Sequence, residues 1–259
     1  MDKSEINTAA QQLYSAQQTR IPIFPLTYTN PDITVAEAYA IQLENIERRL
    51  KAGDVISGKK IGLTSPGIQK QLGVSEPDYG HLFASMSYAR EIPANTLLQP
   101  KIEAEIAFVL KEDLTGGNVT AADVRRATSY IVAAFEIVDS RIADWRIKLP
   151  DTVADNASSG CYVLGKEHIP VGELDLGKIT MRMIKNGGEP VGGGEGSAVM
   201  GDPCVSVAWL ANCLYRYGVS LKKDEVILSG AFSAAHIAVK GDVFRADFSV
   251  LGSVEAFFI

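Results

Sequence analysis

The sequence predicts an α+β protein in which a small, mostly helical N-terminal region precedes a larger β-rich body. Apolar residues recur at helical spacing before Gly53, whereas short apolar runs separated by glycine-rich turns follow it. These runs do not alternate regularly with helices, which argues against a parallel βαβ architecture. We therefore expect residues 1–58 to form the helical region and residues 59–259 the β-rich body, counted together as one domain or separately as two.

Two helices are expected in the N-terminal region, on either side of a proline-rich connector that ends at Pro31. The first presents an apolar face made of Ile6, Ala9, Leu13 and Ala16. Thr34 and Glu37 match a capping box at the start of the second helix, and Gly53 is a natural stop. The apolar stripe predicted for this second helix consists of Ala36, Tyr39, Leu43, Ile46 and Leu50.

The β-rich body is expected to begin with a strand over 55–63 and a short helix over 66–72. Later helices are predicted from Thr120 to about residue 130 and from Asp202-Pro203 to Gly218. Residues 140–160 carry many polar groups and are expected to form an active-site loop, and residues 192–196 a flexible turn. Further strands are predicted over 101–110, 131–139, 161–164 and 179–185, and strands and turns fill residues 225–259.

The composition is that of a globular protein, with 46% hydrophobic and 22% charged residues. A formal net charge of −6 argues against nucleic acid as a partner, because phosphate neutralisation needs a basic face. The sequence contains no apolar run of membrane-spanning length and no signal-like N-terminal segment, so we expect a cytoplasmic protein without membrane partners. The acidic balance also makes the chain a poor electrostatic trap for an anionic substrate.

Several familiar motifs are approached but not matched. The segment from Gly53 to Lys60 resembles a phosphate-binding loop, but its last position is lysine and a helix precedes it, so no nucleotide site is expected. The three histidines, His81, His168 and His236, lack metal-ligand spacing and are interpreted as surface or satisfied core residues.

Two acidic residues on the strand predicted over 101–110 indicate a metal site. Glu103 and Glu105 project to one face because side chains alternate along a strand, and the same face continues with Ala107 and Val109. Two carboxylates beside an apolar surface repel each other, and a hard divalent cation such as Mg²⁺ or Mn²⁺ removes that conflict. The alternative is a solvated strand face that ends in two acids.

A third acid lies in the next buried strand. Glu136 is surrounded by apolar residues over 131–139, where an unpaired carboxylate is costly. It is therefore either a third metal ligand or the partner of a lysine or arginine, and the residues alone leave both open. Three carboxylates would leave about half of an octahedral shell for water and substrate oxygens.

Five segments in this order resemble the hydratase/decarboxylase family of the aromatic meta-cleavage pathways, relatives of fumarylacetoacetate hydrolase. They are residues 59–65 (KKIGLTS), 76–80 (EPDYG), 100–106 (PKIEAEI), 136–142 (EIVDSRI) and 151–158 (DTVADNAS). The resemblance covers nearly the whole chain. It implies a fumarylacetoacetate hydrolase-like β-rich roll that assembles into homo-oligomers.

Within this family, residues 139–145 and 155–158 resemble the 2-hydroxypenta-2,4-dienoate hydratases, also called 2-keto-4-pentenoate hydratases. These are lyases that add water to 2-hydroxypenta-2,4-dienoate and form 4-hydroxy-2-oxopentanoate in aromatic hydrocarbon catabolism. Residues 149–151 and the doubled serine at 158–159 lean toward the sister 4-oxalocrotonate decarboxylases, which act on 2-oxo-3-hexenedioate, so that alternative stays open.

Two other function classes are weaker. A non-catalytic binding subunit is disfavoured because all the acidic site residues, Lys60 and Asp78 are retained. Hydrolysis of a carbon–carbon bond needs a base such as histidine to activate water, and the sequence places none.

The resemblance also assigns roles to residues. It implies that Glu103, Glu105 and Glu136 hold Mg²⁺ or Mn²⁺, that Lys60 and Asp78 are acid–base residues, and that Ser158 is a polar residue of the pocket. Without it, Lys60 would be interpreted as an exposed strand lysine, Asp78 as a turn residue and Ser158 as a loop cap.

The implied mechanism begins with the metal chelating the substrate carboxylate and the neighbouring C2 oxygen. Lys60 would exchange a proton with that oxygen, Asp78 would take one from the attacking water, and Ser158 would orient substrate or water. The expected ligand is a small 2-hydroxydienoate or 2-oxo acid, and association with a neighbouring pathway enzyme is a further expectation.

Overall fold

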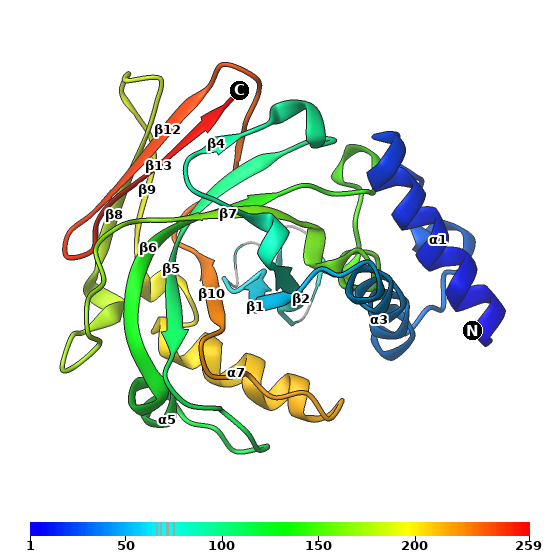
Figure 1. Ribbon diagram of the computed structural model, residues 1–259, viewed down its shortest axis with the longest axis horizontal. Helices are drawn as coiled ribbons and strands as arrows, with labels where there is room; N and C mark the ends of the chain where they lie inside the picture. Colours follow the sequence, from blue (N-terminus) through cyan, green and yellow to red (C-terminus); the bar gives the residue numbers. More distant parts are fainter. Residues whose placement is uncertain (66, 68, 71–72, 75) are drawn as a thin grey trace.

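The computed structural model describes residues 1–65, 67, 69–70, 73–74 and 76–259. It confirms the predicted α+β class, since two sheets curl into a rolled body beside a pair of N-terminal helices (Figure 1). The short helix predicted over 66–72 begins and ends at residues outside the described ones. The helices are α1 (Lys3–Thr19), α2 (Leu26–Thr29), α3 (Val35–Lys51), α5 (Ala121–Ala127), α6 (Leu149–Ala154) and α7 (Pro203–Tyr215).

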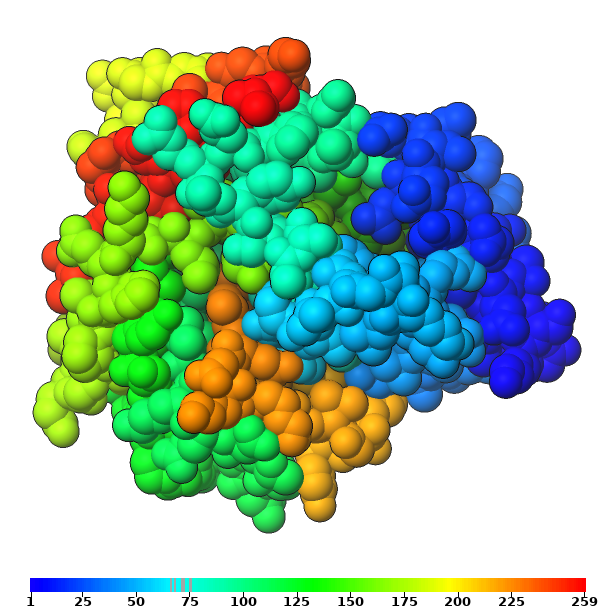
Figure 2. Space-filling view, in the orientation of Figure 1, coloured from blue at the N-terminus to red at the C-terminus, as the bar shows by residue number. Residues whose placement is uncertain are grey.

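The larger sheet has the strand order β2-β1-β10-β5-β6-β7-β3, with β11 paired to β5, and the smaller sheet has the order β4-β13-β12-β8-β9. In the larger sheet, the early strand β1 pairs with β10 from the C-terminal part of the chain. In Figure 2 the segment coloured cyan lies against the one coloured orange. The strands are β1 (Ile56–Gly62), β2 (Asp78–Phe83), β3 (Ser87–Tyr88), β4 (Glu91–Ile92), β5 (Lys101–Leu110), β6 (Thr128–Val138), β7 (Ser159–Leu164), β8 (Thr180–Lys185), β9 (Pro190–Glu195), β10 (Val226–Ala231), β11 (His236–Ile237), β12 (Val243–Phe248) and β13 (Gly252–Phe258).

The capping box of α3 is confirmed, because the Thr34 hydroxyl accepts a hydrogen bond from the Glu37 amide and the Glu37 carboxylate accepts one from the Thr34 amide. The predicted apolar stripe is confirmed only at Tyr39 and Ile46, which are buried. Ala36, Leu43 and Leu50 are exposed, and Gln42 is buried instead. Because α3 packs against both α1 and α6, its inner face is turned away from the position that apolar spacing alone indicated.

Three other expectations about local structure are wrong. The helix predicted to about residue 130 ends at Ala127, and the chain enters β6 at Thr128. The loop expected over 140–160 contains α6, which is too short to show helical periodicity. The glycine-rich turn is the strand β9: Gly194 packs so tightly that an added Cβ would lie 2.0 Å from the Phe232 carbonyl oxygen.

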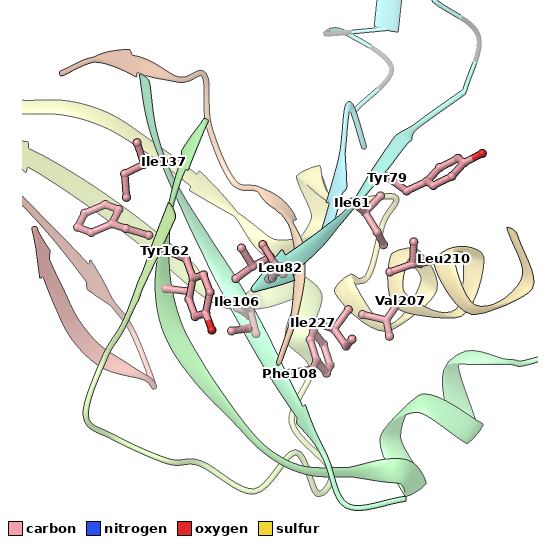
Figure 3. Close-up of a cluster of buried hydrophobic side chains, with 14 of the residues drawn as sticks. Ile61, Tyr79, Leu82, Ile106, Phe108, Ile137, Tyr162, Val207, Leu210 and Ile227 are labelled. Carbon is pink, nitrogen blue, oxygen red and sulfur yellow. The ribbon is translucent and has the colours of Figure 1, made fainter. Parts of the chain in front are cut away.

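One part of the hydrophobic core lies between the larger sheet and α7, and the same cluster extends to the N-terminal helices and the smaller sheet. Figure 3 shows Val207 and Leu210 of α7 directed toward Ile61 of β1 and Ile227 of β10. Asp202 caps α7 by accepting a hydrogen bond from the Cys204 amide, as the Asp-Pro pair predicts. Among the described residues, no helix is both long and apolar enough to cross a membrane.

Candidate active site

The predicted acidic residues meet on one face of the larger sheet. Glu103 of β5 and Glu136 of β6 are direct cross-strand partners, and Glu105 follows Glu103 on the same face of β5. One carboxylate oxygen of each residue lies within 4.8 Å of those of the other two. Glu105 and Glu136 are buried and Glu103 is half-buried, so the solvated strand face is wrong as a description of this cluster.

The oxygen atoms of the cluster are poorly satisfied by the protein. Glu105 Oε1 and both oxygens of Glu136 are buried without a well-directed hydrogen bond from any described residue, although Lys60 lies close to Glu136. Burial and the neighbouring Glu136 charge raise the pKa of Glu103 to about 7, and burial also raises the pKa values of Glu105 and Glu136. Clustered, desolvated carboxylates with free oxygens are the ligand set that suits a hard divalent cation.

The raised pKa values predict how a divalent cation changes stability with pH. The carboxyl of Glu103 is stabilised in its protonated form, so its contribution to folding is complete below about pH 4.5 and is lost as pH rises through about 7. Mg²⁺ competes with these protons, so the increase in unfolding free energy that Mg²⁺ produces should grow from pH 5 to pH 7. Urea unfolding with Mg²⁺ and with EDTA at each pH measures this, and a pH-independent increment would contradict it.

Lys60 lies beside the acidic cluster on β1. Its side chain is 2% exposed, and its Nζ is 3.1 Å from Glu136 Oε1. Burial alone would lower the pKa of Lys60, but the negative charges of Glu136 and Asp78 raise it above its ordinary value. The interpretation of Lys60 as an exposed strand lysine is therefore wrong. Of the two roles left open for Glu136, the structure contains the ion pair, and the position of Glu136 in the acidic cluster is also compatible with metal ligation.

Asp78 begins β2, a fully buried strand that sequence reasoning missed, and it pairs across the ladder with Gly62 of β1. The Thr152 hydroxyl of α6 donates a 2.5 Å hydrogen bond to Asp78 Oδ2. Asp78 Oδ1 is buried and accepts no hydrogen bond from a described residue, so one carboxylate oxygen is held and the other is available to a ligand.

Gly62 makes room for both acid–base candidates. A Cβ at Gly62 would lie 2.3 Å from Asp78 Oδ1 and 3.2 Å from Lys60 Nζ. The side chains of Asp78 and Lys60 therefore approach the backbone at position 62 so closely that a residue with a Cβ would displace them.

The substitution Gly62→Ala should therefore push Asp78 and Lys60 apart while the strand is retained. We expect kcat to fall by roughly 100-fold, the loss that a displacement of about 1 Å can cause. Steady-state kinetics and circular dichroism measure the two effects. Gly188→Ala, in the turn between β8 and β9, is the control, and an unchanged kcat in Gly62→Ala would contradict this reading of the site.

Ser158 reaches the same region through an unusual turn. Asn156, Ala157 and Ser158 all have left-handed backbone conformations, with φ of 55°, 50° and 52°. The strain of such non-glycine residues is held by Asp155, which accepts hydrogen bonds from the Ser158 hydroxyl (3.2 Å) and from Arg141. Burial raises the pKa of Asp155 to about 6 although Arg141 opposes it. The Ser158 proton is directed at Asp155, so its oxygen is left as an acceptor.

A cavity of about 330 Å³ joins these residues. Lys60, Asp78, Glu103 and Ser158 line it, whereas Glu105 and Glu136 lie beneath its surface, adjacent to Glu103. The structure thus brings all six predicted site residues to one place. Its remaining wall is largely apolar and consists of side chains such as Val138, Ile147, Ala198, Ala231, Phe232 and Ala235.

Sequence reasoning missed several residues of this site. Gly230 lies in a bulge of β10, where its amide donates a 2.8 Å hydrogen bond to Glu105 Oε2. Lys101 also lines the cavity, and its Nζ lies 4.2 Å from the centre of the Trp145 ring. The alternation that placed Glu103 and Glu105 on one face places Lys101 there as well, so this residue was accessible to the same argument.

The histidines behave as the sequence interpretation expected. His81 is buried in β2, its Nδ1 lies 3.0 Å from Gln42 Oε1, and burial together with the Lys59 charge lowers its pKa to about 3. His168 stacks on Tyr130. None of the three histidines, His236 included, is among the described residues that line the cavity.

The chain is similar to known proteins over nearly its whole length. Residues 76–258 match the family model described as fumarylacetoacetate (FAA) hydrolase C-terminal. The chain is 49% identical over 260 residues to a 2-keto-4-pentenoate hydratase of Paraburkholderia xenovorans, covering 100% of this chain and 96% of that one. It is 48% identical over 247 residues to a 2-hydroxyhexa-2,4-dienoate hydratase of Comamonas testosteroni, covering 94% and 93%.

A solved structure is also similar over its whole length. The 4-oxalocrotonate decarboxylase from Pseudomonas putida G7, complexed with magnesium and adipate, superimposes with a TM-score of 0.95 at 36% identity, covering 100% of this chain and 99% of that one.

Proposed function

The chain belongs to the fumarylacetoacetate hydrolase family, and on that premise we propose that it is a metal-dependent hydratase. It adds water to 2-hydroxypenta-2,4-dienoate and forms 4-hydroxy-2-oxopentanoate, a hydro-lyase reaction of aromatic meta-cleavage catabolism. The names of the two hydratase relatives support this activity, and the observation that carries it is the acidic cluster beneath one wall of the cavity, with Lys60 and Asp78 beside it.

In this proposal Glu103, Glu105 and Glu136 hold the divalent cation, Mg²⁺ or Mn²⁺. Their clustered oxygens and the buried atoms without hydrogen-bond partners support that role. When bound there, a divalent cation supplies Lewis-acid stabilisation of negative charge on the substrate C2 oxygen, and it offsets the carboxylate charge that keeps Lys60 protonated.

Lys60 exchanges a proton with the C2 oxygen. The dienol loses its hydroxyl proton and gains one at C5, which converts it to a 2-oxo-3-enoate whose C4 is electrophilic through conjugation. Lys60 pairs with Glu136 and also lines the cavity, which supports this role, because its desolvated ammonium group is open to a ligand bound there.

Asp78 and Ser158 act on the attacking water. The Thr152 hydroxyl holds Asp78 Oδ2, which directs the unpaired Oδ1 to accept a proton as water adds to C4. The Ser158 oxygen accepts the other hydrogen of that water, because the Ser158 hydroxyl proton is engaged with Asp155. A proton delivered to C3 then completes 4-hydroxy-2-oxopentanoate.

The decarboxylase activity of the structural relative is the second candidate. It would require the cavity to accept a substrate with a second carboxylate. Among the described lining residues, the cations are Lys60 and Lys101. Apart from two carboxylates and several serine and threonine hydroxyls, the rest of the wall is apolar. This lining favours a substrate whose far end is uncharged.

The test supplies purified protein, with Mg²⁺, with either 2-hydroxypenta-2,4-dienoate or 2-oxo-3-hexenedioate. Loss of diene absorbance with the first substrate, abolished by EDTA and restored by Mg²⁺ or Mn²⁺, is the expected result. Carbon dioxide release from the second substrate without hydration of the first would replace the hydratase with the decarboxylase. Full hydration in EDTA would reject the metal-dependent scheme.

The remaining features of the proposal follow the family resemblance. We expect a cytoplasmic homo-oligomer, and we expect association with a neighbouring enzyme of the same pathway. Size-exclusion chromatography with light scattering measures the number of subunits in the homo-oligomer. Co-purification of a defined pathway enzyme measures the association with that enzyme.

A further inference from the structure

Lys101 differs from Lys60, the other lysine of the cavity, because it forms no ion pair with the described residues. No carboxylate of the described residues lies within 4.0 Å of its ammonium nitrogen, whereas Lys60 in the same cavity pairs with Glu136. Lys101 is half-buried, so its charge is only partly solvated. Glu103 is near enough to act on Lys101 electrostatically but not to form an ion pair with it, so the partly desolvated ammonium group can still bind an anionic ligand.

The surroundings of Lys101 hold it in place. Its Nζ lies 4.2 Å from the centre of the Trp145 ring, a cation–π contact. The Trp145 indole nitrogen donates a 3.2 Å hydrogen bond to the Gln99 carbonyl oxygen, which fixes the ring. The ammonium group is therefore oriented before a ligand arrives, and the entropy lost on binding is reduced.

The position of Lys101 on β5 determines which part of a ligand it meets. Lys101 and Glu103 are two residues apart on one strand face, with α-carbons about 7 Å apart along the strand. Both line the cavity, so a small molecule bound against the acidic cluster can reach Lys101 with a group at its end next to Glu103. The apolar side chains of the lining, such as Ile147 and Phe232, suit the hydrocarbon end of such a molecule.

We infer that Lys101 is a positioning residue that binds the C1 carboxylate of the 2-oxo acid substrate. The inference rests on the proposed function for the identity of the substrate. One carboxylate oxygen accepts a hydrogen bond from the Lys101 ammonium group, and Trp145 holds that group in place. The reacting carbons then extend past Lys60 and Asp78 toward the apolar wall.

The test compares Lys101→Met with the wild type by calorimetric titration of the Mg²⁺-loaded full chain. The probes are 2-oxopentanoate, its methyl ester, which lacks the carboxylate charge, and the dicarboxylate 2-oxoadipate. We expect the substitution to weaken 2-oxopentanoate binding by about 10- to 100-fold, the range for a hydrogen bond to a charged group, and to leave ester binding unchanged. Lys101→Arg keeps the charge and the hydrogen-bond donors and should recover part of the binding lost in Lys101→Met.

Lys185→Met is the matched control. Lys185 also lies over an aromatic ring, 5.2 Å from the centre of Phe244, but it pairs with Asp242 and does not line the cavity. Its substitution should change neither affinity. An Mn²⁺ titration of Lys101→Met, free of substrate, should show the metal affinity retained, so that weaker binding of the probe is not a loss of the cation.

Four outcomes would overturn the inference. If Lys101→Met binds 2-oxopentanoate as tightly as the wild type, Lys101 does not bind the carboxylate. If the wild type does not bind 2-oxopentanoate at all, the inferred carboxylate site is absent. If Lys101→Met weakens binding of the acid and the ester equally, Lys101 contributes only by packing against Trp145. A loss confined to the dicarboxylate 2-oxoadipate places Lys101 at the far end of the substrate.

Kinetics separate this inference from the proposed function. If the wild type hydrates 2-hydroxypenta-2,4-dienoate, Lys101→Met should raise KM with a smaller effect on kcat, because the residue contributes to binding. A wild type that does not hydrate the dienoate, combined with a selective loss of 2-oxopentanoate binding in Lys101→Met, would reject the hydratase and keep the carboxylate site.

Discussion

Replacement of Lys60 by methionine should lower kcat by about 10³-fold, within the range that a general acid–base group contributes. Methionine approximates the length of the lysine side chain but cannot carry a proton to or from the C2 oxygen. The divalent cation should still bind, because the oxygens of Glu103, Glu105 and Glu136 remain. Rapid kinetics of dienoate loss and Mn²⁺ titration of the same preparation separate the two properties.

The same substitution should destabilise the metal-free protein. Lys60 and Glu136 are 2% and 1% exposed, and removing one partner of such a buried pair costs up to about 3–5 kcal/mol. Saturating Mg²⁺ should recover much of this loss, because the cation replaces the missing positive charge. Chemical unfolding with and without Mg²⁺ gives both free energies.

Lys59→Met provides a matched control on the neighbouring residue. Lys59 projects from the opposite face of β1 and forms a buried ion pair with Glu225, with Nζ and Oε1 2.6 Å apart. Its loss should destabilise the protein but leave kcat per folded molecule near that of the wild type. If Lys60→Met retained kcat within tenfold of the wild type, Lys60 would not be the proton-transfer group.

The substitution Glu105→Gln should have opposite effects on metal binding and on stability. Glutamine keeps the shape of the side chain and can still accept the hydrogen bond from the Gly230 amide, but it removes one negative charge from the cluster. We expect metal affinity to fall at least 100-fold, beyond the 10- to 100-fold typical of residues that only support a ligand. Activity at low Mg²⁺ should be lost with it.

The metal-free form of Glu105→Gln should be more stable than the metal-free wild type. The pKa of Glu105 is raised by burial and by the charges of Glu136 and Glu103, so ionised Glu105 opposes folding at neutral pH. Thermal unfolding in EDTA and calorimetric Mn²⁺ titration measure the two effects. Glu112→Gln, an exposed residue just beyond β5, makes the same chemical change as a control. Wild-type Mn²⁺ affinity in Glu105→Gln would remove this residue from the proposed ligand set.

Local patterns were sufficient for the elements whose signals lie within a few residues. The alternation over 101–110 matches β5 residue for residue, and it placed Glu103 and Glu105 on one face. The caps at Thr34 and Asp202 likewise predicted where two helices begin. In each case a single strand or helix contains the whole signal, so no distant contact is needed to interpret it.

Other features depended on contacts between segments far apart in the chain. Leu43 was expected on the buried face of α3 and is exposed, because packing against α1 and α6 selects a different face. The burial of Lys60 follows from the pairing of β1 with β2 and β10. The left-handed turn at 156–158 contains no glycine, so its conformation has no local signal and is held by contacts such as the hydrogen bond from Ser158 to Asp155.

The sequence by itself determined the fold class, the family and the identities of the acidic residues, because periodicity and motif order are properties of neighbouring positions. Only the tertiary structure decided that Gly62 leaves room for Asp78 beside Lys60, that the β10 bulge directs the Gly230 amide at Glu105, and that Lys101 forms no ion pair with the residues that the structure describes. Electrostatic environment is set by all the groups that surround a charge. Those groups come from strands brought together by long-range pairing, which no local pattern records.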